Sequence, residues 1–123
     1  MPATTPFLYV DKVTLAANGT GTASFQVDAG HEAKIKRMWF VSTGSFDIIE
    51  IRDSAGNSYS TASTDKPIPS SALNKPQTAG GGVGEFDPPL YIAPMTVLYI
   101  DLKDTSGSSN TVQVILEGER TTL

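Results

Sequence analysis

The sequence contains no cysteine and only one histidine. Without cysteine, disulfide frameworks, zinc ribbons and thiol catalysis are excluded together. The single histidine, His31, follows Gly30 at an expected strand entry, and no G-x-S-x-G motif supplies a nucleophile on a sharp elbow. We therefore expect no catalytic residues and no enzymatic activity.

Basic residues are also few. Nine Lys and Arg stand against thirteen Asp and Glu, which gives a net charge of -4. The densest basic stretch, residues 34–37, would divide its charges between the two faces of a strand. Nucleic-acid binding requires clustered cations that displace phosphate counterions, so we expect no nucleic-acid partner.

Long apolar runs and metal-binding runs are missing from the sequence as well. Apolar runs such as 38–41 and 114–116 are far shorter than the ~20 residues that span a bilayer, so no membrane association is expected. Met1–Pro6 has no basic start and no apolar region, which predicts no secretion signal and synthesis in a cytosol.

No D-x-D-x-D-G run occurs, and Asp53 and Asp104 fit turns. We expect no cofactor and no metal, with calcium held by loop oxygens as the alternative.

What the sequence does contain is a series of short strands separated by turn residues, with no helical period of useful length. Thr22 to Asp28 shows the alternation of a sheet with one wet side. Met38–Val41 is apolar on both faces, as in a strand that protein covers on both sides. Trp39 and Phe40 would point to opposite faces, so we expect both to be buried, one in the core between the sheets and one by a loop or a neighbouring subunit. We expect Trp39, the only tryptophan of the sequence, to be a core residue. The expected strands cover residues 7–15, 22–28, 33–43, 46–52, a short stretch near 59, 90–92, 95–103 and 111–119.

The segment from 62 to 89 interrupts this pattern with five prolines and a glycine cluster, which disfavour a central strand. A long connection of this kind is usually functional. Its isolated apolar side chains fit no strand pattern, and we predict that they form an interface: Ile68, Leu73, Val83 and Phe86. The alternative is that the loop only caps one end of the core.

The count predicts an all-β fold, an antiparallel two-sheet sandwich of about eight strands. We favour a jelly roll, because an immunoglobulin domain has more evenly spaced strands and no place for so long a connection. Residues 7–120 would form a single domain, with tails at 1–6 and 121–123. No internal repeat points to a propeller or a solenoid.

Two segments carry a resemblance to a known group of proteins. Residues 35–53, IKRMWFVSTGSFDIIEIRD, resemble the central hairpin of small jelly-roll structural proteins in tailed phages and related viruses. Residues 90–120 resemble the later strand pair of these proteins, with an entry proline, a Ser- and Gly-rich turn and a closing Leu-x-Gly-x-Arg, here Leu116 to Arg120.

The resemblance implies a capsid decoration (cement) protein, or the base of a head fibre, located in the virion after assembly in the host cytoplasm. It implies a major capsid protein or another virion protein as the partner, and a homo-oligomer, with a trimer favoured. The alternative function is a carbohydrate-binding β-sandwich module, which requires a platform of exposed aromatic rings.

Overall fold

A computed structural model describes residues 3–73 and 85–123 of the chain. The described residues form two antiparallel sheets of four strands and one short 3-10 turn, η1 (Ser70–Leu73). The strands are β1 (Ala3–Leu15), β2 (Thr20–Gln26), β3 (His31–Ser42), β4 (Phe46–Asp53), β5 (Ile68–Pro69), β6 (Glu85–Ile92), β7 (Val97–Asp104) and β8 (Asn110–Thr122). The expected all-β, two-sheet sandwich is confirmed.

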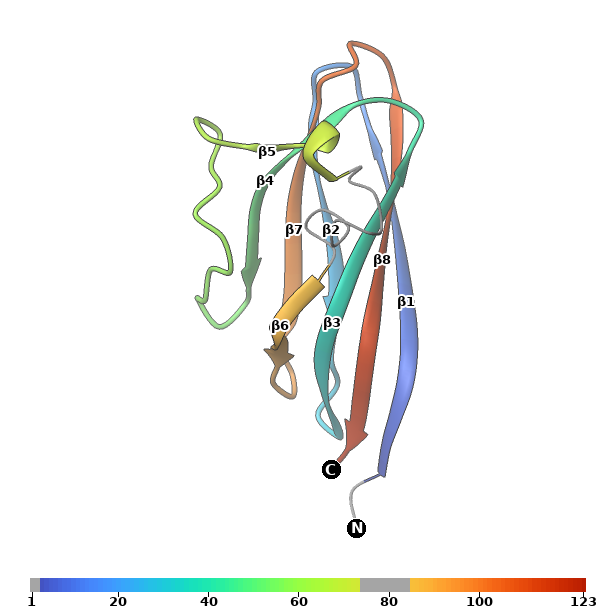
Figure 1. The fold of residues 1–123 in the computed structure, drawn as a ribbon, viewed down its shortest axis with the longest axis vertical. Helices are drawn as coiled ribbons and strands as arrows, with labels where there is room; N and C mark the ends of the chain where they lie inside the picture. The colour runs from blue at the N-terminus through green and yellow to red at the C-terminus, as the bar shows by residue number, and fades with distance from the viewer. Residues whose placement is uncertain (1–2, 74–84) are drawn as a thin grey trace.

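The two sheets are built from strands that are far apart in the chain. Sheet A has the order β1-β8-β3-β6, and sheet B has the order β2-β7-β4-β5 (Figure 1). Apart from β4 and β5, consecutive strands lie in different sheets, so the chain passes repeatedly from one layer to the other. Alternate residues of each strand therefore face the space between the layers.

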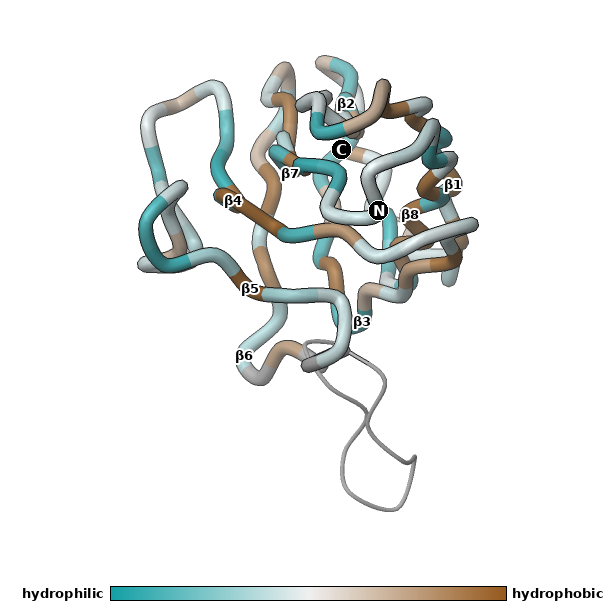
Figure 2. The backbone as a smooth tube through the Cα atoms, turned by 90° about the horizontal axis from the view of Figure 1, so that it is seen from above, coloured by the Kyte–Doolittle hydropathy of each residue, from teal (hydrophilic) through white to brown (hydrophobic). Residues whose placement is uncertain are grey.

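That space is filled by aliphatic side chains from both sheets. Ile35 and Leu116 of sheet A and Ile48 and Leu102 of sheet B are at most 1% exposed. Aromatic rings also meet across the layers, since Tyr9 and Phe25 have ring centroids 4.7 Å apart. Along β1, exposed and more buried residues alternate from Phe7 to Leu15, and Figure 2 shows both hydrophobic and hydrophilic residues along this strand. The core thus lies between the sheets and needs no disulfide.

Within the expected terminal tails, residues 3–6 and 121–122 belong to strands. Residues 3–6 begin β1 and pair with residues 119–122 of β8, from Ala3 opposite Thr122 to Pro6 opposite Glu119. Thr4 and Thr121 also share a hydrogen bond through their hydroxyls at 2.9 Å. These short polar ends gave no hydrophobic alternation, but antiparallel pairing extends β1 and β8 through them.

The segment 62–89 contains more structure than its prolines suggest. β5, η1 and most of β6 lie in it. Pro88 and Pro89 fit within β6 because β6 is an edge strand, where a missing N–H costs little. Its pairing with β3 also skips from Leu90 to Glu85 opposite Ile35 and Arg37, so the prolines lie in the interruption.

The expectation of a short strand near Tyr59 is wrong. Tyr59 donates its N–H to the Ile51 carbonyl at 2.7 Å, but this region forms only an isolated bridge between Arg52 and Ser58. The fifth strand is β5 instead. Asn18 adopts a positive φ of 58° in the turn between β1 and β2, and because these two strands join different sheets, the turn does not close a hairpin.

Candidate interaction surface

The inward and outward alternation of side chains along β3 decides which of its apolar residues are buried. A β-bulge lies between Ile35 and Arg37, and after it Met38 points inward and is 1% exposed. Phe40 also faces inward, packs against the core and has its ring centroid 5.5 Å from that of Phe46. Trp39 is therefore on the outer face and only half-buried, so its expected place in the core is wrong.

Trp39 belongs to an apolar group on the outer face of sheet A, which we call the sheet A patch. In the strand register, Val10 of β1, Ile115 of β8 and Trp39 of β3 form one row across three strands. The patch consists of Leu8, Val10, Trp39, Val41 and Ile115. Leu8, Val10 and Val41 are 63%, 53% and 55% exposed, so a large part of this apolar surface faces water.

Charged side chains border the patch along the same three strands. Lys36 forms an ion pair with Glu119, and Arg37 Nε lies 3.6 Å from Glu117 Oε2. The hydrogen bond from Lys36 lowers the pKa of Glu119. Lys12 is exposed at the opposite end of the patch, next to Gln113. Exposed ion pairs of this kind add little stability to a fold. Here they form a polar border around the patch.

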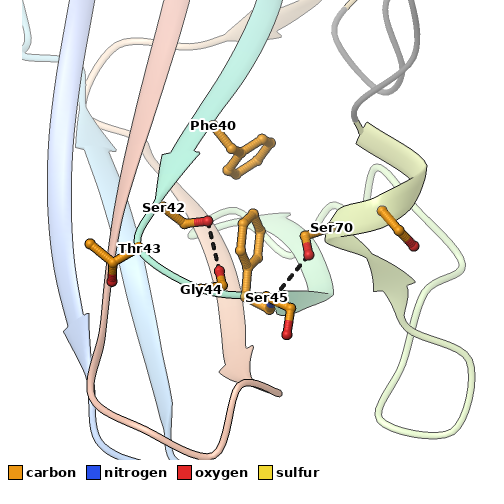
Figure 3. A pocket seen from close by; sticks show the side chains of 8 residues that line it. Phe40, Ser42, Thr43, Gly44, Ser45 and Ser70 are labelled. Carbon is orange, nitrogen blue, oxygen red and sulfur yellow. Dashed lines mark hydrogen bonds between the residues drawn. The ribbon is translucent and has the colours of Figure 1, made fainter.

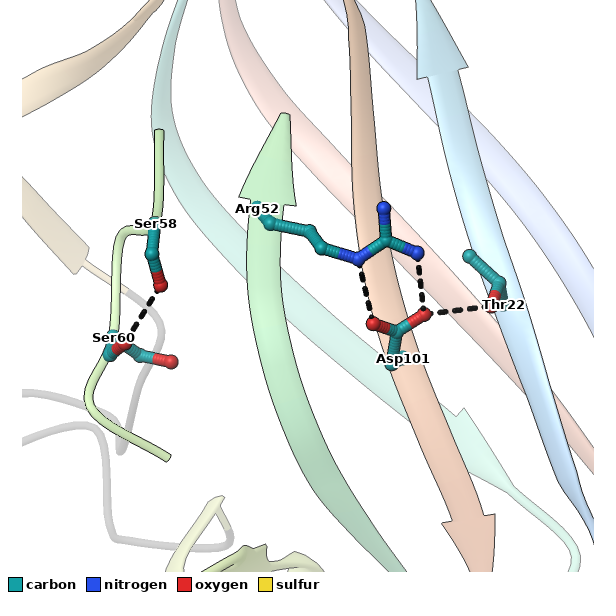
Figure 4. Close-up of polar contacts among 5 residues, drawn as sticks. All are labelled: Thr22, Arg52, Ser58, Ser60 and Asp101. Carbon is teal, nitrogen blue, oxygen red and sulfur yellow. Dashed lines mark hydrogen bonds and ion pairs between the residues drawn. The ribbon is translucent and has the colours of Figure 1, made fainter. Parts of the chain in front are cut away.

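The outer face of sheet B has a different character. Arg52 of β4 donates two hydrogen bonds to Asp101 of β7, at 2.8 and 3.2 Å, and the Thr22 hydroxyl donates a third at 2.7 Å (Figure 4). The Arg52 guanidinium also covers the Tyr99 ring at 4.6 Å. Burial opposes ionisation of Asp101, but the hydrogen bonds from Arg52 and Thr22 outweigh it and lower its pKa. This network satisfies its polar groups within the chain.

A hollow of about 420 Å³ lies at one end of the sandwich, between the β3–β4 turn and η1 (Figure 3). Two phenylalanines and several hydroxyl side chains line it. The Ser42 hydroxyl donates to the Gly44 carbonyl at 2.7 Å, and Ser70 Oγ accepts the Phe46 N–H at 3.1 Å. These hydroxyls stabilise turns, and the lining residues carry no acid, base or ion pair.

Two buried carboxylates have structural partners. Asp104 accepts hydrogen bonds from the Asn18 N–H at 2.8 Å, the Ser106 hydroxyl at 2.6 Å and the Asn110 amide at 3.0 Å. Asp53 accepts the Asn57 N–H at 2.9 Å and the Tyr59 hydroxyl. Both pKa values are lowered, whereas burial and Asp53 raise the pKa of Tyr59 to about 12. Asp53 and Asp104 are the last residues of β4 and β7, and their side chains bond to the turns that follow these strands.

The remaining candidate groups do not converge on a reaction centre. His31 Nδ1 lies 2.6 Å from Asp28 Oδ1 in an exposed turn. Tyr9 donates its hydroxyl to the Ser24 carbonyl, and Tyr91 donates to Glu32. Within residues 3–73 and 85–123, no group of three or more His, Asp or Glu side chains could hold a metal ion. The same residues contain no helix long and apolar enough to cross a bilayer.

The structure describes the side chains of two of the four predicted interface residues. Ile68 and Phe86 are partly buried and pack against the core, a placement that favours the capping alternative for these two side chains. Val83 and the Leu73 side chain lie outside the described part of the chain. Sequence reasoning missed the sheet A patch, although the doubly apolar run 38–41 already indicated a strand covered on both sides.

Comparison of the sequence with models of known protein families, and with curated proteins, found no match.

Proposed function

We propose that this chain is a non-enzymatic structural protein of a virus particle, a capsid decoration or cement protein or the base of a head fibre. The observation that carries the proposal is the sheet A patch, an exposed apolar surface on a rigid sandwich whose own core is already filled. The sequence resemblance to small phage structural proteins supplies the narrower assignment to a virion.

The strand order supports the same proposal. Two antiparallel sheets with the orders β1-β8-β3-β6 and β2-β7-β4-β5, and a chain that alternates between them, are what a jelly roll requires. Jelly rolls are frequent among viral capsid proteins and lectins. This order supports our proposal that the sandwich is a jelly roll.

Such a protein would act by burying a large contact area against its partners. A patch that buries several large apolar side chains against a partner gains roughly 25 cal/mol for each Å² removed from water. Repetition over a shell multiplies weak contacts through avidity. The resemblance implies two kinds of partner: other copies of this chain, with a homotrimer favoured, and the major capsid protein or another virion protein.

The test uses virus particles from the culture that produces the protein. We expect peptide mass spectrometry to find the chain in the density-gradient fraction that contains particles. Particles that lack the chain should disassemble at a lower temperature, and addition of purified protein should restore the parent value. A chain that remains in the particle-free fractions and leaves particle stability unchanged would exclude this function.

The carbohydrate-binding alternative gains one observation, the position of Trp39 on an outer face beside Arg37 and Gln113. Sugar rings stack on exposed indoles, and polar neighbours orient their hydroxyls. Tyr9, Tyr59 and Tyr99 do not extend this platform, because each is engaged within the chain. Binding on a glycan array that Trp39→Ala abolishes would favour this alternative over the virion role.

A further inference from the structure

We infer that the sheet A patch is the contact between two copies of this chain, which pack the outer faces of their A sheets against each other about a two-fold axis. The inference rests on the proposed structural role and names the partner of its apolar surface. Four observations support it: the size of the face, the placement of its charges, the state of the neighbouring edges and the contrast with sheet B.

The face has the size that a stable pair requires. β1, β8 and β3 are 13, 13 and 12 residues long. At about 3.3 Å per residue and about 4.8 Å between strands, they form a face of roughly 40 by 14 Å. With the relief of its side chains, such a face approaches the ~800 Å² per partner of a standard protein interface.

A two-fold axis across the strands, through the row of Val10, Ile115 and Trp39, places each member of this row opposite its own copy. The rows on either side then exchange places. Lys12, which lies one row from the axis on β1, comes opposite the partner's Leu8 and diagonal to the partner's Glu117, which lies in the same row on the neighbouring strand β8 and near Arg37 of its own chain. The pair forms twice, once on each side of the axis, so the charges that border the patch are complementary in this arrangement.

Sheet faces pack well in pairs. Two sheets stack about 10 Å apart with their mean strand directions within about 30° of each other. Three sheet faces around a three-fold axis would meet only along their borders, and the row of Val10, Ile115 and Trp39 would stay partly exposed to water. The patch therefore indicates a dimer, which differs from the trimer that the resemblance favours.

The β1 edge of sheet A is a poorer contact than the face of the sheet. Along β1, alternate residues direct their backbone N–H to the same side. Pro6 has no N–H, and the Lys12 N–H donates to Asp11 Oδ1 at 2.9 Å. Pro6 and Lys12 are both even-numbered, so their backbone nitrogens face the same side of β1. A strand added at this edge would therefore have no free N–H to bind at either position. Proteins protect edge strands from pairing in this way.

The adjoining edge of sheet B is protected as well. Tyr9 donates its hydroxyl to the Ser24 carbonyl at 2.9 Å, and Asp11 Oδ2 accepts the Ser24 N–H at 2.8 Å. On the outer face of sheet B, Arg52, Asp101 and Thr22 bond to one another. Of these surfaces, the sheet A patch alone combines large exposed apolar side chains with a polar border.

The first experiment measures the mass of the full-length protein by sedimentation velocity over a range of concentrations. We expect about twice the 13.0 kDa of the chain. Val10→Asp should weaken association more than 100-fold. Gln26→Asp, which places the same charge on an exposed position of β2 on the outer face of sheet B, should leave it unchanged. A parent protein that is monomeric or trimeric at every concentration would overturn the two-fold contact.

Charge reversal tests the arrangement itself. Lys12→Glu and Glu117→Lys should each weaken the dimer about tenfold, and the double variant should recover most of the loss. Lys103→Glu, a matched reversal on β7 in sheet B, should have no effect. Failure of the double variant to recover, with all variants folded by circular dichroism, would contradict the pairing of Lys12 with Glu117.

Cross-linking gives a readout that does not depend on these variants' affinity. The parent has no cysteine, so a single introduced thiol is unique. Val10→Cys should form covalent dimers with a short bismaleimide, whereas Gln26→Cys should not. Equal yields from the two variants would refute the face-to-face pair.

The two proposals fail in different ways. A monomer that still binds and stabilises virus particles would remove the dimer and keep the virion role. A dimer that never appears on particles would keep the face-to-face contact and remove the virion role.

Discussion

At the scale of single residues, neighbours along β3 have opposite surroundings. Met38 is 1% exposed in the core, whereas Trp39 is half-buried on the outer face. Truncation of a fully buried methionine removes its packing and leaves a cavity, which costs ~2 to 5 kcal/mol. We expect Met38→Ala to lower the free energy of unfolding by about this amount, and Trp39→Ala to lower it by less.

Urea denaturation followed by far-ultraviolet circular dichroism would measure both changes, because this signal does not depend on the single tryptophan. Val41→Ala, on the same outer face as Trp39, provides a control for the loss of exposed apolar surface. A Trp39→Ala variant that loses as much stability as Met38→Ala would show that Trp39 is covered within the monomer.

The carboxylate of Asp104 makes the stability of the fold depend on pH. Hydrogen bonds, first of all from the Ser106 hydroxyl, lower the pKa of Asp104 in the folded protein although burial acts against them. The unfolded chain, with a pKa of about 3.9, then takes up its proton first as the pH falls. The contribution of Asp104 is therefore complete above about pH 4 and is lost below it.

We expect Asp104→Asn to lower the unfolding midpoint at pH 7 and to flatten the decrease of stability between pH 5 and pH 2. Thermal melts across this range would test both. The control is Asp65→Asn, which changes an exposed carboxylate outside the strands. An Asp104→Asn variant that loses stability with acid as steeply as the parent would assign the pH dependence to other groups, with Asp53 the next candidate.

At this scale the sequence predicted turn chemistry better than side-chain direction. Asp53 and Asp104 were recognisable because Asx side chains bond to nearby backbone groups in turns. The direction of Trp39 depended on the bulge between Ile35 and Arg37, which shifts the alternation of β3 by one residue. A bulge leaves no reliable mark in a single sequence.

At the scale of the elements, Gly118 shows how closely the strands of sheet A approach. It lies opposite Ile35 at the start of the β3 bulge. A Cβ at Gly118 would overlap the carbonyl oxygen of Lys34, a backbone atom that cannot rotate away. This contact also gives a physical reason for the glycine of the Leu-x-Gly-x-Arg sequence.

We expect Gly118→Ala to destabilise the protein by roughly 2 kcal/mol or more, or to prevent folding. Gly30→Ala is the control, because the nearest atom to its added Cβ, Asp28 Oδ1, lies at an ordinary 3.7 Å. Expression, far-ultraviolet circular dichroism and chemical denaturation of the two variants would compare them. Similar stabilities would indicate that the strands separate here at little cost.

The strands themselves were largely predictable, and the exceptions share a cause. Alternation located β2, β4 and β7 to within a few residues, because each has one face in the core and one in water. β5 and the start of β6 were missed because prolines normally exclude strands. Only the sheet order shows that these prolines lie at an edge.

At the scale of the whole molecule, the candidate surface depends on contacts that sequence patterns do not contain. The sheet A patch joins Leu8 and Val10 of the first strand to Ile115 of the last and to Trp39 of the third. Each strand separately shows an apolar residue on its outer face, which is common on protein surfaces. Only the order of sheet A brings these residues together into one exposed area.

The same sheet order brings the two ends of the chain together. Ala3 pairs with Thr122, so the two ends of the described chain, Ala3 and Leu123, lie at the same end of the sandwich (Figure 1). A fold that depends on strand pairing rather than on the position of its termini should tolerate new ends at an exposed connection. We expect a circular permutant to fold when a short Gly-Ser linker joins residue 123 to residue 1 and the chain is opened between Thr61 and Ala62.

This permutant should keep the near-ultraviolet circular dichroism of the parent and unfold within several degrees of it, because no strand is interrupted. A second permutant, opened between Ile100 and Asp101, divides β7 at the centre of sheet B and should fail to fold. If the first permutant keeps the parent's solution mass, the association surface also survives the change of termini, as expected for a contact through the sheet A patch. An unfolded first permutant would show that pairing of the terminal strands must precede the rest of the fold.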